Sequence, residues 1–231
     1  MRAVLEQIGW DAPLRIEAEG APAPLDDTHV RIDVEACGVC YRDLIDRAGR
    51  LPFIACPITP GHEAVGHVSE VGEGVTQWAV GDRVATMHRD ACGECPACER
   101  GATSHCESAA WVFGLLAQGG YADRLVAPER ALFAVPEDLP AAHAAVMHCT
   151  FGTAYRNLVT AGGLTAGEKV VVTGANGGVG AAAVEIAARL GARVTAVVRR
   201  EVHRPFLEAL GATHVVVAED GRFHKKAESR D

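Results

Sequence analysis

The sequence predicts two fold classes in one chain, a mainly β region that forms a barrel or sandwich and a partial α/β sheet after it. Two observations predict the first region. Short apolar segments follow one another as far as Pro140, and frequent glycines and prolines separate them. A third observation predicts the second region. Beyond residue 168, strands and helices succeed one another as β-α-β-α-β, the mononucleotide half of a dinucleotide-binding sheet.

The composition is that of a globular protein, and it excludes several partners. The chain has 231 residues, of which 48% are hydrophobic and 23% charged, so it can bury a core. A net charge of −8 argues against binding to nucleic acid or to an anionic membrane surface. No apolar run reaches transmembrane length, and Glu6 and Asp11 interrupt any signal-peptide pattern. Eight cysteines, four of them at metal-type spacing, then indicate the reducing cytoplasm rather than a disulfide scaffold.

The elements expected in the β region follow from its alternating pattern. In its first clear strand, Val30, Ile32 and Val34 alternate with charged residues, which predicts one buried face. The apolar runs and the turn residues between them predict, in order, a strand over 30–36, a short helix over 41–48, strands over 64–71 and 80–85, and a strand through 125–126.

Four cysteines stand at the spacing C-x2-C-x2-C-x7-C, and they are Cys92, Cys95, Cys98 and Cys106. Each C-x2-C turn aims two sulfurs inward, and four thiolates are common ligands of a structural Zn²⁺. An iron–sulfur cluster uses similar spacings, but Pro usually follows its last cysteine, and here Glu107 follows. Unrelated cysteines or two disulfides are further alternatives. A closed four-thiolate site has no open position, so it predicts a structural role.

The α/β region begins after Pro140 with an alanine-rich, helical segment over 141–158. The elements expected next are a strand over 169–173, a helix, a strand over 193–198, a short helix over 206–210 and a strand over 214–218. The first of these helices is expected to bury one face, made of Val179, Ala183, Ile186, Ala187 and Leu190.

The glycine-rich turn before that helix is a candidate cofactor site, and its residues are Gly174, Ala175, Gly177, Gly178, Val179 and Gly180. Small residues let the backbone approach a pyrophosphate at a helix N-terminus, although Ala175 takes the first position of G-x-G-x-x-G. A simple tight turn is the alternative. Arg199 and Arg200 follow the second strand, where an NAD enzyme carries an acid, and arginines pair with a 2′-phosphate. NADP(H) is therefore favoured over NAD(H), unless the arginines belong to a solvated loop.

A second metal site is a further candidate, with Cys40, His62 and Cys149 as ligands and Glu63 beside His62. A cysteine–histidine–cysteine set with an open fourth position is typical of catalytic zinc. Their separation in the sequence cannot show that these residues meet. A lone histidine in a turn is also more often structural.

The motifs together resemble the medium-chain zinc-dependent dehydrogenase/reductase superfamily. Those that carry the resemblance, in order, are Cys37-Gly-Val-Cys40, Gly61-His62-Glu63-Ala-Val-Gly66, the four cysteines, Gly120-Tyr121-Ala122 and the glycine turn. The resemblance implies a GroES-like zinc-binding catalytic domain over 1–148, with a structural zinc lobe near 88–110, and the first half of a Rossmann domain over 149–231. It also implies that Cys40, His62 and Cys149 hold a catalytic zinc, and that Glu63 can exchange with bound water or substrate.

Two positions depart from the alcohol dehydrogenases of that family. Arg42 stands where they carry a proton-relaying Ser or Thr, and Ile45 stands where many carry a histidine. Arginine stays charged and cannot shuttle a proton as a hydroxyl does. Cys40-Tyr-Arg-Asp-Leu44 and Tyr155-Arg156 are instead similar to the acryloyl-CoA reductase branch. That branch transfers hydride from NADPH to an activated C=C bond, with a zinc or cationic group that polarises the carbonyl. Arg42 is the cationic candidate, and an ion-pair arginine is the alternative.

Only three strands of the expected sheet are present, against about six in a complete Rossmann domain, and residues 219–231 are polar. The sequence therefore predicts a C-terminally truncated or frameshifted member, or one half of a split protein. Its function is expected to be zinc-dependent NADP(H) oxidoreduction of a small molecule. A zinc alcohol or aldehyde dehydrogenase and a non-catalytic zinc-binding fragment are the alternatives. Full-length members are expected to be homo-oligomers, an assembly not expected of this chain.

Overall fold

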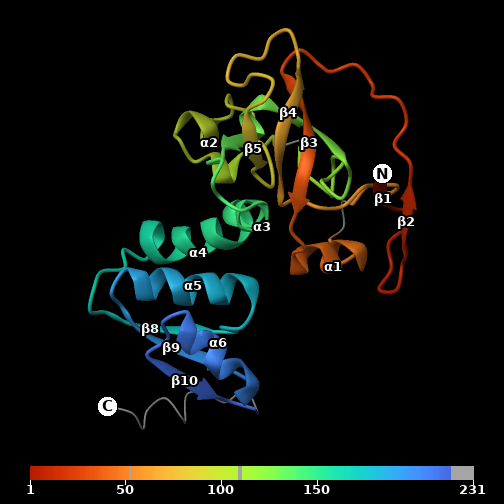
Figure 1. Ribbon diagram of the computed structural model, residues 1–231. Coiled ribbons are helices and arrows are strands. Elements are labelled where there is room, and N and C mark those ends of the chain that lie inside the picture. Colours follow the sequence, from red (N-terminus) through yellow and green to blue (C-terminus); the bar gives the residue numbers. More distant parts are fainter. Residues whose placement is uncertain (52–53, 109–110, 220–231) are drawn as a thin grey trace. The chain divides into compact units, whose positions relative to one another are not determined.

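The computed structural model describes residues 1–51, 54–108 and 111–219, and it divides into two compact units, Met1–Cys149 and Thr150–Asp231. Figure 1 shows the β-rich first unit and the α/β second unit. Within the described residues, no helix combines the length and the apolar character that a membrane crossing needs.

The first unit is built on a five-stranded sheet of order β6-β3-β4-β5-β7, in which every neighbouring pair is antiparallel. Its strands are β3 (His29–Cys37), β4 (Ala64–Val71), β5 (Arg83–Thr86), β6 (Arg124–Pro128) and β7 (Leu132–Ala134). A separate antiparallel pair joins β1 (Arg2–Leu5) and β2 (Leu14–Glu17). The buried face of the sheet packs Val30, Ile32, Val84 and Leu125 around Phe113, which is fully buried. This core fixes the ends of β3 and β4, where the site residues lie.

Short helices connect these strands and carry the cysteines. They are α1 (Tyr41–Arg47) after β3, α2 (Pro96–Glu99) within the cysteine knuckle and α3 (Ala141–Ala145) near the end of the unit, with 3₁₀ turns at Thr103–His105 and Glu129–Ala131. The chain then passes through a wide π-type turn (Met147–Gly152), α4 (Thr153–Tyr155) and a second π-type turn (Arg156–Ala161).

The second unit is a three-stranded parallel sheet of order β10-β9-β8. Its elements are β8 (Lys169–Thr173), α5 (Gly178–Arg189), β9 (Arg193–Val198), a 3₁₀ turn at Glu201–His203, α6 (Arg204–Ala209) and β10 (His214–Val217). Helix α5 packs on β8 and β9, and α6 packs on β10. Among the described residues, β8 pairs with β9 alone and so forms an edge of the sheet.

The fold class predicted from the sequence is confirmed, and several details are corrected. The strand expected over 80–85 begins only at Arg83, because Gly81 makes a turn at a φ of +99°. The helix expected over 141–158 is interrupted by the π-type turns. The buried face of α5 is Ala182, Val184 and Ala187, whereas the predicted Val179 and Leu190 are 45% and 37% exposed. Alanines on several sides of the helix leave no single apolar stripe to predict from. Most of 219–231 lies outside the described residues.

Candidate metal centres and cofactor loop

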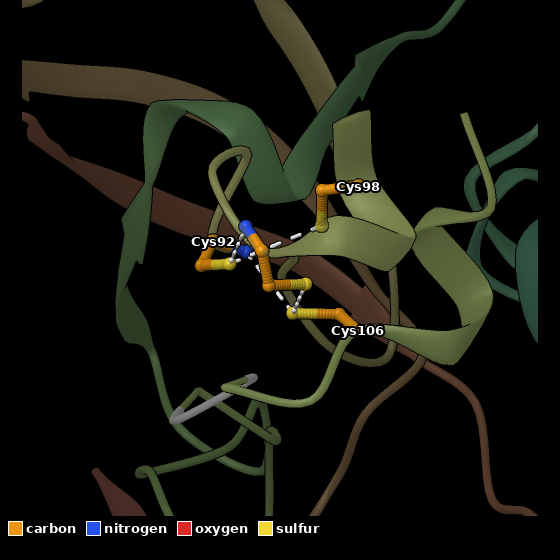
Figure 2. A group of neighbouring side chains, drawn as sticks. Cys92, Cys98 and Cys106 are labelled. Atoms are coloured by element: carbon orange, nitrogen blue, oxygen red, sulfur yellow. Dashed lines mark hydrogen bonds between the residues drawn. The ribbon is translucent and has the colours of Figure 1, made fainter. Parts of the chain in front are cut away.

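The sulfurs of the four knuckle cysteines all lie within 4.8 Å of one another. Figure 2 shows Cys92, Cys98 and Cys106 of this group. The Sγ atoms of Cys92 and Cys98 lie 3.9 Å apart, and those of Cys95 and Cys106 lie 4.0 Å apart. A tetrahedral Zn²⁺ with Zn–S bonds of about 2.3 Å requires sulfurs roughly 3.8 Å from one another. The sulfur positions therefore fit a four-thiolate zinc ion.

Backbone N–H groups of the knuckle point at these sulfurs. The N–H of Cys92 donates to Cys106 Sγ and that of Cys95 donates to Cys92 Sγ, each at an N···S distance of 3.3 Å. The N–H groups of Glu107 and then of Cys98 lower the pKa of the Cys95 thiol to about 6, because they stabilise the thiolate. The loop thus supplies donors that favour the metal-binding form of the cysteines.

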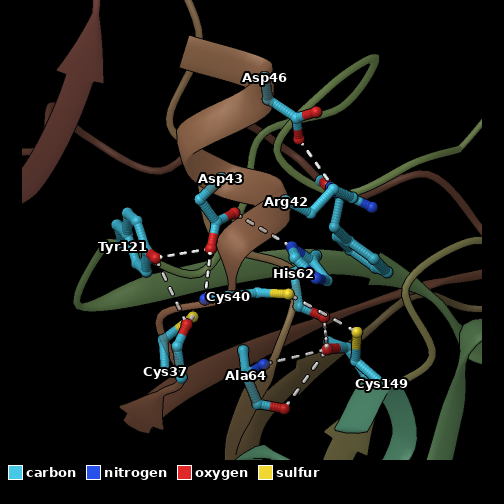
Figure 3. Close-up of polar contacts among 12 residues, drawn as sticks. Cys37, Cys40, Arg42, Asp43, Asp46, His62, Ala64, Tyr121 and Cys149 are labelled. Atoms are coloured by element: carbon cyan, nitrogen blue, oxygen red, sulfur yellow. Dashed lines mark hydrogen bonds and ion pairs between the residues drawn. The ribbon is translucent and has the colours of Figure 1, made fainter. Parts of the chain in front are cut away.

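A second cluster unites Cys40, His62, Glu63 and Cys149. Figure 3 shows Cys40, His62 and Cys149 of this cluster. Cys40 is the N-cap of α1, His62 and Glu63 lie directly before β4, and Cys149 lies in the first π-type turn. One ligand atom from each lies within 4.8 Å of the others, and the two sulfurs are 4.0 Å apart. The fold therefore brings together residues that the sequence separates by as many as 109 positions.

The imidazole of His62 is held so that one nitrogen faces this cluster. The side chain is buried, and its Nδ1 lies 3.1 Å from Asp43 Oδ1. Among the described residues, Nε2 is buried and has no hydrogen-bond partner. The hydroxyl of Thr86 donates to the carbonyl of His62 and accepts the N–H of Ala64, which fixes the main chain on either side of Glu63. A buried nitrogen without a partner beside two sulfurs fits a metal ligand.

The electrostatics of the cluster favour a cation. The contact with Cys149 and then the proximity of His62 lower the pKa of Cys40 to about 4, while the same contact with Cys40 raises the pKa of Cys149. Burial lowers the pKa of His62, but the hydrogen bond with Asp43 and the nearby Cys40 thiol outweigh it and raise that pKa to about 9. A bound divalent ion would replace the protons held on these groups.

The carboxylate of Glu63 is buried against the turn before α1. Burial raises its pKa, because the charged form loses water. A Cβ added at Gly38 would lie 2.3 Å from Glu63 Oε2, so only a glycine leaves room for this carboxylate. Gly38 thus contributes to the site because its lack of a side chain leaves room for Glu63.

The glycine turn joins β8 to α5 in the second unit. Gly174 has a φ of +61°, and a Cβ added at Gly180 would lie 2.3 Å from the carbonyl oxygen of Gly174. Ala175 is fully buried, and its N–H donates to the carbonyl of Val197 on β9. The first turn of α5 therefore lies close against the loop, as a phosphate-binding turn requires.

The predicted arginines lie beside this turn. Arg199 and Arg200 follow β9 and are exposed. A cavity of about 460 Å³ is lined by Asn176 of the glycine turn, by both arginines, and by His203 and Glu219. The structure therefore brings the glycine turn and the arginine pair to one cavity.

Comparison with known proteins identifies the family. Residues 26–137 match the alcohol dehydrogenase GroES-like domain family. The acryloyl-coenzyme A reductase of Sulfurisphaera tokodaii is 36% identical over 187 residues, which are 81% of this chain and 55% of that protein. The crystal structure of AibC is 41% identical with a TM-score of 0.91, covering 99% of this chain and 64% of that one. A cobalt- and zinc-bound alcohol dehydrogenase from Pyrobaculum aerophilum is 34% identical with a TM-score of 0.86, covering 98% and 67%.

The chain belongs to the medium-chain, zinc-containing alcohol dehydrogenase family. It spans 55% and 63% of the first two curated relatives that it matches. The relatives include dehydrogenases and reductases; the Pyrobaculum structure holds zinc, and a zinc-binding dehydrogenase from Sinorhizobium meliloti, 30% identical with a TM-score of 0.83, is bound to NADP. The assignment of each ligand and cofactor residue in this chain stays a prediction.

Arg42, which the family resemblance places where alcohol dehydrogenases carry a relay hydroxyl, forms an ion pair in the structure. Its Nε lies 3.0 Å from Asp46 Oδ2, and its Nη2 donates to the carbonyl of Phe113 at 2.7 Å. Asp46 is buried, and its burial raises its pKa despite the arginine. The ion-pair alternative is the arrangement in the structure, and a role of Arg42 toward substrate stays a prediction.

Asp43, Tyr121 and His203 also belong to these sites, although the sequence did not single them out. Asp43 stands three residues after Cys40, the spacing at which a carboxylate caps the N-terminus of a helix, and that spacing could have found it. Tyr121 was quoted only as part of a motif. His203 follows the arginine pair by three residues, within a segment expected to be loop.

Proposed function

We propose that this chain carries the zinc and NADP(H) sites of an oxidoreductase that reduces an activated C=C bond, such as that of an enoyl or acryloyl thioester. The observation that supports this most is Arg42. Its guanidinium is engaged by Asp46 and Phe113 at the position of the relay hydroxyl, so this position offers no hydroxyl proton path for alcohol oxidation. The acryloyl-CoA reductase relative supports the same substrate class.

The residues of the second cluster would hold the catalytic zinc. Cys40, His62 and Cys149 are its proposed ligands, and Glu63 is the carboxylate that can take or leave the fourth position. Zinc at this position would act as a Lewis acid on the thioester carbonyl. The buried Asp43 holds His62 in the tautomer that presents Nε2. The knuckle, with four thiolates, would bind zinc in a purely structural way.

The cofactor preference is proposed from the cavity of the second unit. Arg199 and Arg200 would pair with the 2′-phosphate of NADPH, and Asn176 and His203 add polar side chains to the same cavity. Arg200 Nη2 lies 3.4 Å from His203 Nε2, so the two side chains converge. Glycines 177, 178 and 180, with Gly174, Ala175 and Val179, would receive the pyrophosphate at the start of α5.

The test is to compare substrates with the zinc-loaded chain, by following the absorbance of the reduced cofactor. Faster oxidation of NADPH with an acryloyl or enoyl thioester than with an aldehyde, and faster than alcohol oxidation with NADP⁺, is the expected order. The reverse order would replace the proposal by an alcohol or aldehyde dehydrogenase, which the Pyrobaculum relative supports. Binding of zinc and NADPH without turnover of any of these substrates would favour a non-catalytic fragment. Cys40→Ser is the inactive control, and Cys56→Ser, outside both clusters, is the matched active one.

A further inference from the structure

The hydroxyl of Tyr121 contacts the carboxylate of Asp43, which in turn contacts His62 of the second metal cluster (Figure 3). Its hydroxyl donates to Asp43 Oδ2 at 2.8 Å, whereas its other neighbour, the carbonyl of Gly38, is at 3.4 Å. The short contact to a carboxylate is the stronger of the two. Tyr121 therefore contributes a hydroxyl to the surroundings of the proposed catalytic zinc without belonging to the cluster of ligands.

Asp43 connects this hydroxyl to two of the proposed ligands. Its Oδ1 faces His62 Nδ1 at 3.1 Å, and its Oδ2 accepts the N–H of Cys40 at 2.8 Å in addition to the Tyr121 hydroxyl. The carboxylate of Asp43 is buried, so these three contacts are its polar surroundings among the hydrogen bonds of the described residues. Asp43 thus orients the ring of His62 and holds the main chain of Cys40. The hydrogen bonds that it accepts keep its carboxylate in one orientation.

Tyr121 also packs on the turn that delivers His62. Gly61 has a φ of +95°, and a Cβ added there would lie 2.7 Å from Tyr121 Cδ1. The N–H of Tyr121 donates to the carbonyl of Pro60 at 3.0 Å. The ring and main chain of Tyr121 are therefore fixed by the same turn whose next residue is the histidine, so the hydroxyl has a defined direction.

We propose that Tyr121 is a positioning residue for the second zinc, acting through the chain Tyr121–Asp43–His62. The inference rests on the proposed zinc site of Cys40, His62 and Cys149. The hydroxyl anchors Asp43 Oδ2, and the anchored carboxylate holds His62 Nε2 toward the metal. Second partners of a metal-bound histidine typically alter metal affinity about 10–100-fold, and Tyr121 is one bond further away. We expect loss of its hydroxyl to weaken zinc binding at this site about tenfold.

The experiment compares Tyr121→Phe with Tyr41→Phe, in which an exposed tyrosine loses the same atom. Each full-length protein is loaded with zinc, and the dissociation constants of its zinc ions are measured by competition with a chelator. Tyr121→Phe is expected to lose affinity for one zinc, while the knuckle zinc and the melting temperature of the zinc-free protein stay as in the parent. In an Asp43→Asn background, Tyr121→Phe is expected to cause no further loss, because its effect passes through Asp43.

Other outcomes would overturn the proposal. Equal zinc affinities in Tyr121→Phe and Tyr41→Phe would show that the hydroxyl positions nothing. A loss of affinity at both zinc sites together, or an equal loss in the Asp43→Asn background, would indicate general destabilisation instead. A parent protein that binds zinc only at the knuckle would remove the proposed catalytic zinc site itself, and so would overturn the proposed function as well.

Discussion

The two cysteine clusters differ in how they are built. The knuckle takes all four sulfurs from residues 92–106, and the loop itself directs N–H groups at them. The second cluster takes its ligands from the N-cap of α1, the segment before β4 and a π-type turn. Local spacing determines the first site, whereas the packing of the five-stranded sheet and its connections determines the second. A local zinc loop can therefore hold structure, while an assembled site can hold an open position for chemistry.

The largest expected effect is loss of the knuckle zinc. In Cys95→Ser, one of the four thiolates is removed, and the zinc content is expected to fall by one ion per chain. Structural zinc contributes about 10–16 kcal/mol of apparent binding free energy in small zinc domains, so the knuckle is expected to unfold. Metal analysis and amide hydrogen exchange over residues 88–108 measure the effect. Unchanged zinc content and unchanged melting would contradict a structural zinc here.

Loss of the second zinc is expected to have a smaller structural effect. Cys149→Ser removes one ligand of an assembled site whose surroundings are also held by Asp43, Thr86 and the core around Phe113. The zinc content is again expected to fall by one ion, but the knuckle is expected to stay protected from exchange. If Cys149→Ser unfolded the knuckle as well, the two sites would not be independent, and the contrast between them would fail.

A third prediction concerns the cofactor. A charge-assisted hydrogen bond contributes about 1.5–3 kcal/mol, which is tenfold or more in affinity. Replacing Arg199 and Arg200 by alanine is expected to weaken NADPH binding by at least about tenfold and to leave NADH nearly unchanged. Arg189→Ala, an exposed arginine on α5, is the matched control. Equal weakening of both cofactors in a binding titration would show that the pair does not recognise the 2′-phosphate.

The smallest expected effect is association through β8. Among the described residues this strand pairs only with β9, its Val171 is 53% exposed, and no charge lies within Val170–Val172. Unpaired apolar edges promote pairing between chains, so we expect concentration-dependent association and little turnover. Val171→Lys is expected to reduce the association seen by size-exclusion chromatography, and Val202→Lys, exposed in the 3₁₀ turn after β9, is expected not to. A monodisperse, active parent protein would contradict this prediction.

The sequence was most informative where structure is local. The knuckle, the glycine turn, β4 and β8 follow from spacing and short apolar runs, and the structure has β4 and β8 at the predicted bounds. Strands β1, β2 and β7 were missed because they have only three or four residues and owe their pairing to distant partners. The second cluster was expected from a family resemblance, because no local pattern relates Cys149 to Cys40. Tyr121 was missed for the same reason, since its contact with Asp43 spans 78 positions. Asp43 has a local capping signal, but its contact with His62 spans 19 positions and could not be read from the sequence.

The contrast between a closed and an open zinc site is tested most directly by replacing zinc with Co²⁺ and adding imidazole as a probe ligand. The absorption of cobalt depends on its ligands, and a closed four-thiolate site has no position for an added one. We expect two cobalt ions per chain, with imidazole shifting the spectrum of one and leaving the other unchanged. Cys149→Ser is expected to abolish the shift, and Cys95→Ser is expected to preserve it. A single bound cobalt, or two that both ignore imidazole, would contradict the account.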